Sequence, residues 1–81
     1  MGLLDKRRRV KAIIVRIWNQ TPPGAPWYYW VYVLFDSNGE RIKIHLKKSQ
    51  AKKFVDVSAE GDVGYLDFKG DRMYSWERTK G

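Results

Sequence analysis

The sequence has no cysteine among its 81 residues, so neither a disulfide framework nor a zinc–thiolate site stabilises it. It has a single histidine, His45, and only nine acidic residues against sixteen Lys and Arg, which leaves a net charge of +7. Its longest uncharged run, residues 17–35, is interrupted by three prolines and by two polar amides and is not expected to cross a membrane. These absences favour a small basic domain that folds on its apolar core alone.

Alternation of apolar and polar residues predicts a mainly β domain. Residues 8–19 carry apolar side chains on both faces, which is typical of a long, bent strand at the corner of a small barrel. The expected strands cover residues 8–19, 27–36, 41–47, 63–68 and 72–77, and a short helix covers residues 49–55 with Ser49 as its N-cap. We therefore expect a five-stranded, mainly antiparallel barrel of the OB or SH3-like kind, with the helix between the third and fourth strands.

The chain is expected to form one domain. We place the barrel at residues 10–78, a basic N-terminal arm at residues 1–9 and a C-terminal tail at residues 79–81. Residues 1–20 and 41–60 hold the excess of positive charge, +5 and +4 respectively. Such an excess favours an anionic partner, either nucleic acid or an anionic membrane surface, although it also serves solubility alone.

Asn38 and Gly39 predict a two-residue type I′ hairpin turn between the second and third strands, because both residues tolerate positive φ. In the register that this turn imposes, residues whose numbers sum to 77 lie opposite each other. Three of these pairs are wholly apolar and are expected in the core, namely Phe35 with Ile42, Val33 with Ile44, and Val31 with Leu46.

The other face of the same hairpin combines aromatic and cationic side chains. Trp30 is expected opposite Lys47, and Tyr32 opposite His45, with Lys43 on the same face. Three interpretations remain open. The lysine stems cover the rings through cation–π contacts and need no ligand, or the rings stack on bases while the cations bind phosphates. In the third, the terminal segments of the chain cover Trp30 and Tyr32. All five of these residues are therefore candidate ligand-binding residues.

A cluster of lysines continues from this face into the expected helix. Lys48 and Lys52 are i,i+4 neighbours there, and like charges at this spacing repel each other. The pattern indicates either a nearby anion or a solvated helix face. We add Lys48, Lys52 and Lys53 to the candidate ligand-binding residues.

Enzyme chemistry finds little support in the sequence. No nucleophile–base pair can be placed around His45, and the spacing of Asp62, Asp67 and Asp71 matches no calcium loop. We expect a non-catalytic binding module without catalytic residues, metal or cofactor, and single-stranded nucleic acid is the first choice of partner. The alternative is a protein-interaction or membrane-adjacent domain. The expected location is the cytoplasm, or the soluble part of a membrane-anchored protein from which an N-terminal helix was removed.

The order of segments resembles a bacterial domain family of unknown function, the YhhM-like proteins. A basic strand VKAIIVRIW is followed by YYWVYVLFDSNGERIKIHL and then by EGDVGYLDFKGDRMYSWER. The positions of the family signature are occupied by Gly61-Asp62, Gly64-Tyr65-Leu66, Gly70 and Trp76-Glu77-Arg78, and the likeness covers about residues 10–78. The resemblance implies a small barrel, usually placed behind one N-terminal membrane helix, and implies no reaction. The start MGLLDKRRR departs from that arrangement.

Overall fold

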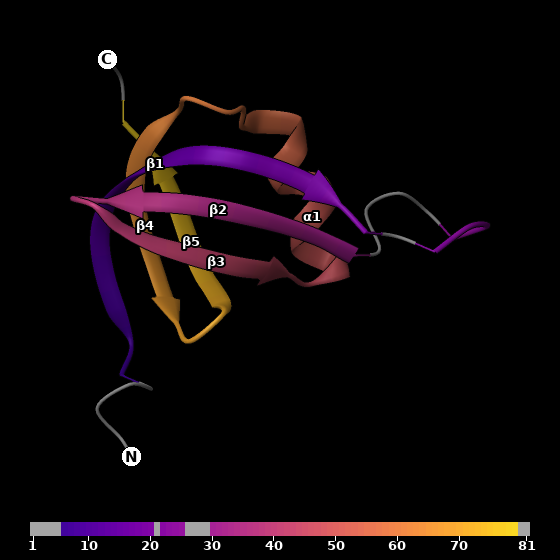
Figure 1. Cartoon of the computed structure of the whole chain (residues 1–81), viewed down its shortest axis with the longest axis horizontal. Helices are drawn as coiled ribbons and strands as arrows, with labels where there is room; N and C mark the ends of the chain where they lie inside the picture. The colour runs from indigo at the N-terminus through magenta and orange to yellow at the C-terminus, as the bar shows by residue number, and fades with distance from the viewer. Residues whose placement is uncertain (1–5, 21, 26–29, 80–81) are drawn as a thin grey trace.

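Five antiparallel strands form one sheet in the order β3-β2-β1-β4-β5 (Figure 1). The computed structural model describes residues 6–20, 22–25 and 30–79. The elements are β1 (Arg8–Asn19), β2 (Val31–Ser37), β3 (Glu40–Leu46), α1 (Lys48–Val57), β4 (Val63–Lys69) and β5 (Arg72–Arg78). The expectation of a mainly β domain with a helix between the third and fourth strands is confirmed. No helix in the described ranges is long and apolar enough to span a membrane.

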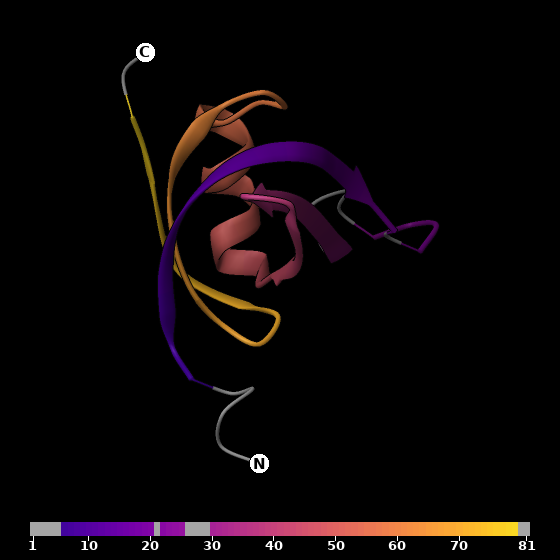
Figure 2. The same ribbon diagram turned by 60° about the vertical axis from the view of Figure 1, so that its left-hand side comes forward.

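Strand β1 carries one extra residue relative to β2. The pairing register shifts between Ile14 and Arg16, which leaves Val15 as a bulge. Because of this bulge, Ile14 and Ile17 both face the core although they are three positions apart. The side chain of Glu60 stabilises the irregular backbone, because its Oε2 accepts a hydrogen bond from Ile17 N–H at 2.9 Å. Figure 2 shows the strong curvature of β1.

The β2–β3 hairpin has the register that the sequence predicts. Asn38 and Gly39 have φ values of 57° and 92°, as a type I′ turn requires. The three apolar pairs are formed, and all six of their side chains are buried. Ala51 and Phe54 of α1 complete this core from the concave side of the sheet, and Phe54 lies 6.3 Å from Phe35 between ring centroids (Figure 2).

The two edges of the sheet, β3 and β5, meet at one end. The His45 N–H donates a hydrogen bond of 2.9 Å to the Asp71 carbonyl, and Gln50 Nε2 of α1 donates one of 2.7 Å to the Met73 carbonyl. The first turn of α1, which follows β3 directly in the chain, is therefore anchored to β5. The sheet curls so far that its first and last strands in spatial order come into contact.

Several boundaries differ from expectation, and two of them bear on the candidate site. Strand β2 begins at Val31, so Trp30 precedes it, and the expected strand residues 27–29 lie outside the described residues. Helix α1 begins at Lys48 with Lys47, and not Ser49, at the N-cap position. The chain turns into the helix directly after β3, which leaves Ser49 inside the first turn. The side chain of Gln50 supplies the cap instead, because its Oε1 accepts from Lys47 N–H at 3.3 Å.

The hairpin turn gives a first test of the fold. We expect Gly39→Val to lower the free energy of unfolding by more than about 1 kcal/mol, because a β-branched residue resists positive φ. Gly39→Asn should cost much less, since asparagine tolerates this conformation. Chemical denaturation of the two variants checks the difference, and equal stabilities would show that the strain does not arise from the backbone at this position.

Gly64 gives a second test. It lies in β4 opposite Ala12, and a Cβ atom added there would overlap the carbonyl oxygen of Glu77 and lie 2.9 Å from Arg78 Cα. We expect Gly64→Ala to destabilise the domain by about 1–3 kcal/mol, because the clash is with backbone that cannot rotate away. Ser75→Ala, at an exposed position of β5, is the control in the same denaturation experiment. A Gly64→Ala variant as stable as this control would contradict the close approach.

Candidate functional site

Four rings stack in a row on the outer face of β1, β2 and β3. Trp18 stacks on Tyr32 with 5.5 Å between centroids, Tyr32 on His45 with 4.8 Å, and His45 on Trp30 with 5.1 Å. The strand ladders align the first three, since Trp18 lies opposite Tyr32 and Tyr32 opposite His45. We call Trp18, Tyr32, His45 and Trp30 the aromatic column.

The position of Trp30 differs in detail from the expected one. The β2–β3 ladder ends at Val31 and Leu46, so the pair expected between Trp30 and Lys47 lies beyond it. The indole instead stacks on His45 with only 4° between the ring planes, while Trp30 as a whole is 37% exposed. The rings of the column therefore cover parts of one another's faces. In a flat platform of separate rings, each face would be open to a ligand.

Two cations lie over the column. Lys43 Nζ is 4.7 Å from the ring centroid of Tyr32 and 5.8 Å from that of Trp18, and Arg16 Cζ is 5.3 Å from the Trp18 centroid. The cation–π contacts of the ligand-free interpretation are thus present. An exposed contact of this type is worth only about 0.5–1 kcal/mol, so a phosphate can compete for either cation.

Trp18 and Arg16 are members of this site that the sequence reasoning missed. Strand β1 is predicted with both residues on one face, together with Ala12 and Ile14. In the structure, Ala12 and Ile14 are buried while Arg16 and Trp18 face outward, because the bulge at Val15 separates the two halves of the strand. The only signal in the sequence is the apolar character of both faces, which indicates a bend but not its position.

The candidate lysines divide into two groups. Lys47, Lys48 and Lys52 line a shallow hollow of about 550 Å³ at the start of α1, directly after β3. Lys53 lies on another side of the helix, in a groove of about 320 Å³ between α1 and β5. The structure therefore gathers Lys47, Lys48 and Lys52 around one hollow and places Lys53 at another.

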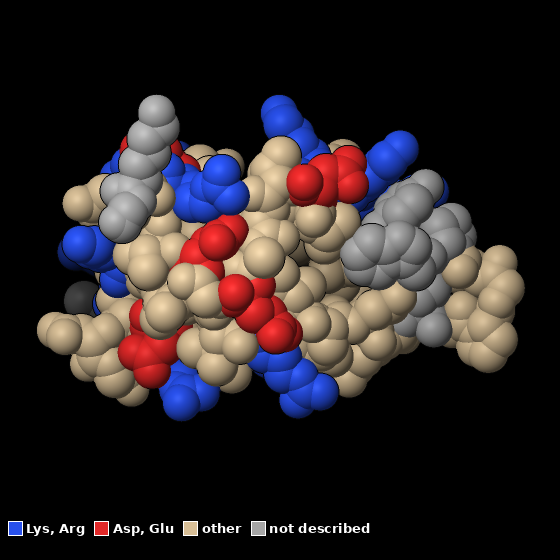
Figure 3. All heavy atoms as spheres, turned by 90° about the horizontal axis from the view of Figure 1, so that it is seen from above, with Lys and Arg blue, Asp and Glu red and all other residues tan. Residues whose placement is uncertain are grey.

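Arginines and lysines differ in whether carboxylates neutralise them. Five arginines form ion pairs, namely Arg7 with Asp67, Arg8 with Glu40, Arg9 with Glu77, Arg41 with Asp36, and Arg78 with Asp62. Arg8 and Arg9, which we expected in the basic N-terminal arm, are the first two residues of β1. Figure 3 shows a face on which acidic and basic groups lie intermixed. Within the described ranges, Lys43, Lys47 and Lys52 form no ion pair, and their charge remains available to an anionic ligand.

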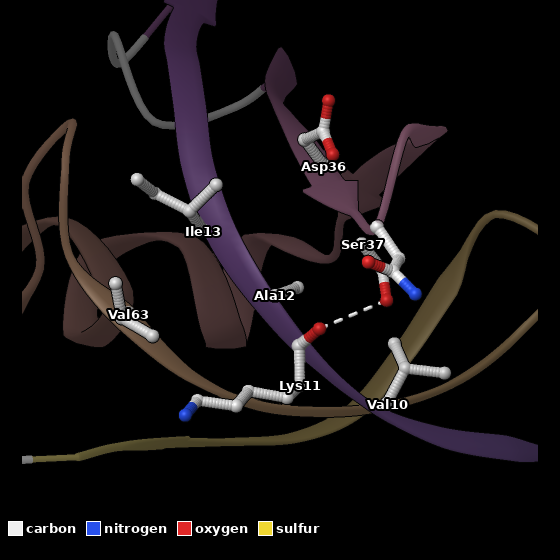
Figure 4. A pocket seen from close by; sticks show the side chains of 8 residues that line it. Val10, Lys11, Ala12, Ile13, Asp36, Ser37 and Val63 are labelled. Carbon is white, nitrogen blue, oxygen red and sulfur yellow. Dashed lines mark hydrogen bonds between the residues drawn. The ribbon is translucent and has the colours of Figure 1, made fainter.

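A separate hollow of about 590 Å³ lies where β1 passes the end of β2 (Figure 4). Ile13 and Val63 line one side of it, and Ser37 Oγ donates a hydrogen bond of 2.8 Å to the Lys11 carbonyl on the other. Asp36 also lines it, but its carboxylate is held by Arg41 at 3.1 Å.

In the part of the chain that the structure describes, no group of three or more His, Cys, Asp or Glu side chains could hold a metal ion.

Comparisons with protein-family models, with curated proteins and with solved structures each found no match to this chain.

The paired carboxylates predict a pH dependence. Two hydrogen bonds of 2.8 Å from the Arg7 guanidinium lower the pKa of Asp67, and those from Arg8 likewise lower the pKa of Glu40. A carboxyl group with a lowered pKa stabilises the fold above its unfolded pKa of about 4, and this contribution is lost as the pH falls through the folded pKa.

NMR titration of the side-chain carboxyl carbons measures both groups separately. We expect Arg7→Gln to raise the titration midpoint of Asp67 and to leave that of Glu40 unchanged, and Arg8→Gln to do the reverse. Each variant is thus the control for the other. A midpoint of Asp67 that does not respond to Arg7→Gln would show that this ion pair does not persist in solution.

Proposed function

We propose that this chain is a non-catalytic module that binds single-stranded nucleic acid on the outer face of β1, β2 and β3. The observation that carries the proposal is the aromatic column together with Lys43, Lys47 and Lys52, which form no ion pair among the described residues. Lys43 lies over the rings of the column, and Lys47 and Lys52 line the hollow at the start of α1, directly after β3. Rings and cations side by side are the means by which proteins bind single strands without reading their sequence. The proposed binding residues are Trp18, Trp30, Tyr32, Lys43, Lys47, Lys48 and Lys52, and His45 lies among them within the aromatic column.

The arrangement of strands supports this choice of face. We infer a partly open five-stranded barrel of the OB kind, since β1 pairs with both β2 and β4 while β3 and β5 approach each other at the His45–Asp71 hydrogen bond. Domains of that kind bind oligonucleotides on the face of their second and third strands. The aromatic column lies on this face. Membership of the YhhM-like family and a cytoplasmic location remain predictions.

The geometry also indicates how affinity is divided. The inner rings of the column already stack on each other, so several bases cannot each find an open ring face. Phosphate contacts from the lysines therefore supply most of the affinity, and binding weakens steeply as salt is added. The bases contribute through stacking, which every base offers and which discriminates little between them.

The alternative, a protein-interaction domain, is favoured by one observation at another place. The groove between α1 and β5 has apolar walls formed by Phe54, Val57, Met73 and Trp76. The indole Nε1 of Trp76 is buried and has no hydrogen-bond partner within the described ranges. A protein ligand in this groove would bind through apolar contact, and its affinity would depend little on salt. The salt dependence of binding therefore separates the two functions.

The lysines provide the main test. We expect Lys43→Ala and Lys47→Ala each to reduce the slope of log K against log salt by about 0.7–1, because each removes one phosphate contact. Lys11→Ala is the matched control, since it removes the same charge from β1 at the position opposite Tyr65. Fluorescence anisotropy with a labelled oligothymidylate at several salt concentrations measures the slopes. Absence of binding at low salt, or an equal slope change in the control, would contradict the proposal.

Truncation of an exposed ring tests stacking independently of charge. Trp30→Ala should weaken binding by about 1–3 kcal/mol without changing the salt slope, because it removes a stacking surface and no charge. Trp30 is exposed, so the variant is expected to keep the stability of the wild type, which thermal unfolding checks. An unchanged affinity in a folded variant would exclude Trp30 from the binding site.

A further inference from the structure

The His45 imidazole fills a slot between two larger rings. Its centroid lies 5.1 Å from that of Trp30, with 4° between the planes, and 4.8 Å from that of Tyr32, with 24° between the planes. Trp18 supports the far face of Tyr32 at 5.5 Å. The slot thus lies between two aromatic walls, the Tyr32 wall is supported by Trp18, and the smallest ring of the column occupies it.

Ring contacts hold the imidazole in this slot. Its Nε2 is buried, and no hydrogen-bond partner among the described residues reaches it. A buried nitrogen without a partner has lost its water at a cost in free energy, which offsets part of the stabilisation from the ring contacts. Rotation of the side chain to another rotamer would return the nitrogen to water.

The backbone beneath the imidazole would not have to move. The His45 N–H donates to the Asp71 carbonyl at 2.9 Å, and the neighbouring residues Ile44 and Leu46 are fully buried in the core. Strand β3 is therefore fixed at this point, and release of the ring needs only a side-chain rotation. Side-chain rotations at a protein surface are fast and do not require unfolding.

We propose that a nucleobase of the bound strand displaces the His45 imidazole and inserts between Trp30 and Tyr32. A base is planar, as the slot requires, and it is larger than imidazole, so it overlaps more of both walls. Lys43 Nζ lies 4.7 Å from the Tyr32 ring centroid, where it can meet the phosphate of the same nucleotide. This inference rests on the proposed function and adds to it one intercalated base, with His45 as the group that closes the slot in the free protein.

The ring protons of His45 report on the displacement in the unmodified protein. Sandwiched between two aromatic rings, they should resonate well upfield of their usual positions in the free protein. On addition of an oligothymidylate of about eight nucleotides, they should move toward the positions of an exposed histidine. The backbone amides of Lys43 and Lys47, followed in the same NMR titration, report on binding itself.

The possible outcomes separate the inference from the function on which it rests. If the amides of Lys43 and Lys47 shift while the His45 ring protons remain upfield, the strand binds but no base enters the slot, and the inference is wrong. If no amide shifts at low salt, both the function and the inference are wrong. Only movement of amides and ring protons with the same dissociation constant supports the displacement.

A variant with an empty slot provides a second measurement. In His45→Ala the base no longer has to displace a ring, so we expect the affinity for the oligothymidylate to rise by roughly threefold or more. His45→Phe, which refills the slot with an apolar ring of larger area, should bind less tightly than His45→Ala. An affinity of folded His45→Ala that is equal to or below that of the wild type would overturn the inference.

Discussion

The extra residue at Val15 is the constraint on which the rest of this structure depends. Without it, β1 would keep one alternation along its whole length, and Ile14 and Ile17 could not both face the core. With it, the strand bends, pairs with β2 along one half and with β4 along the other, and the sheet curls until its edges meet. The same shift turns Trp18 outward beside Tyr32. The core and the candidate site are thus two consequences of one bulge.

Most of the arginines of this protein form ion pairs with carboxylates. The pairs of Arg7 with Asp67 and of Arg8 with Glu40 are bidentate and join segments that are distant in sequence. Their planar guanidinium groups suit such geometry, whereas an ammonium group is a mobile point charge. Lys43, Lys47 and Lys52 have no such partners among the described carboxylates. The net charge of +7 therefore understates how strongly the surface beside the column attracts anions.

Much of the candidate site could be predicted because it lies on one hairpin. The turn at Asn38 and Gly39 sets the β2–β3 register locally, and this register places Tyr32, His45 and Lys43 on one face. Trp18 and Arg16 could not be placed in this way, since their position depends on a bulge whose backbone is bonded to Glu60 in a distant loop. The helix cap was misplaced for a related reason. The side chain of Gln50 accepts a hydrogen bond from Lys47 N–H and donates one to the Met73 carbonyl. Met73 is distant in the sequence, so local patterns do not predict this contact.

The sequence by itself determined the mainly β class, the hairpin register, the three apolar core pairs of that hairpin and the excess of positive charge. All of these depend on alternation, turn chemistry and composition, which are properties of neighbouring residues. The tertiary structure alone decided the strand order, the stacking of four rings into a column and the division of cations into paired and unpaired groups. These features join residues that are far apart in the chain. Their partners are chosen by the curvature of the sheet and by the packing beneath it, neither of which local periodicity encodes.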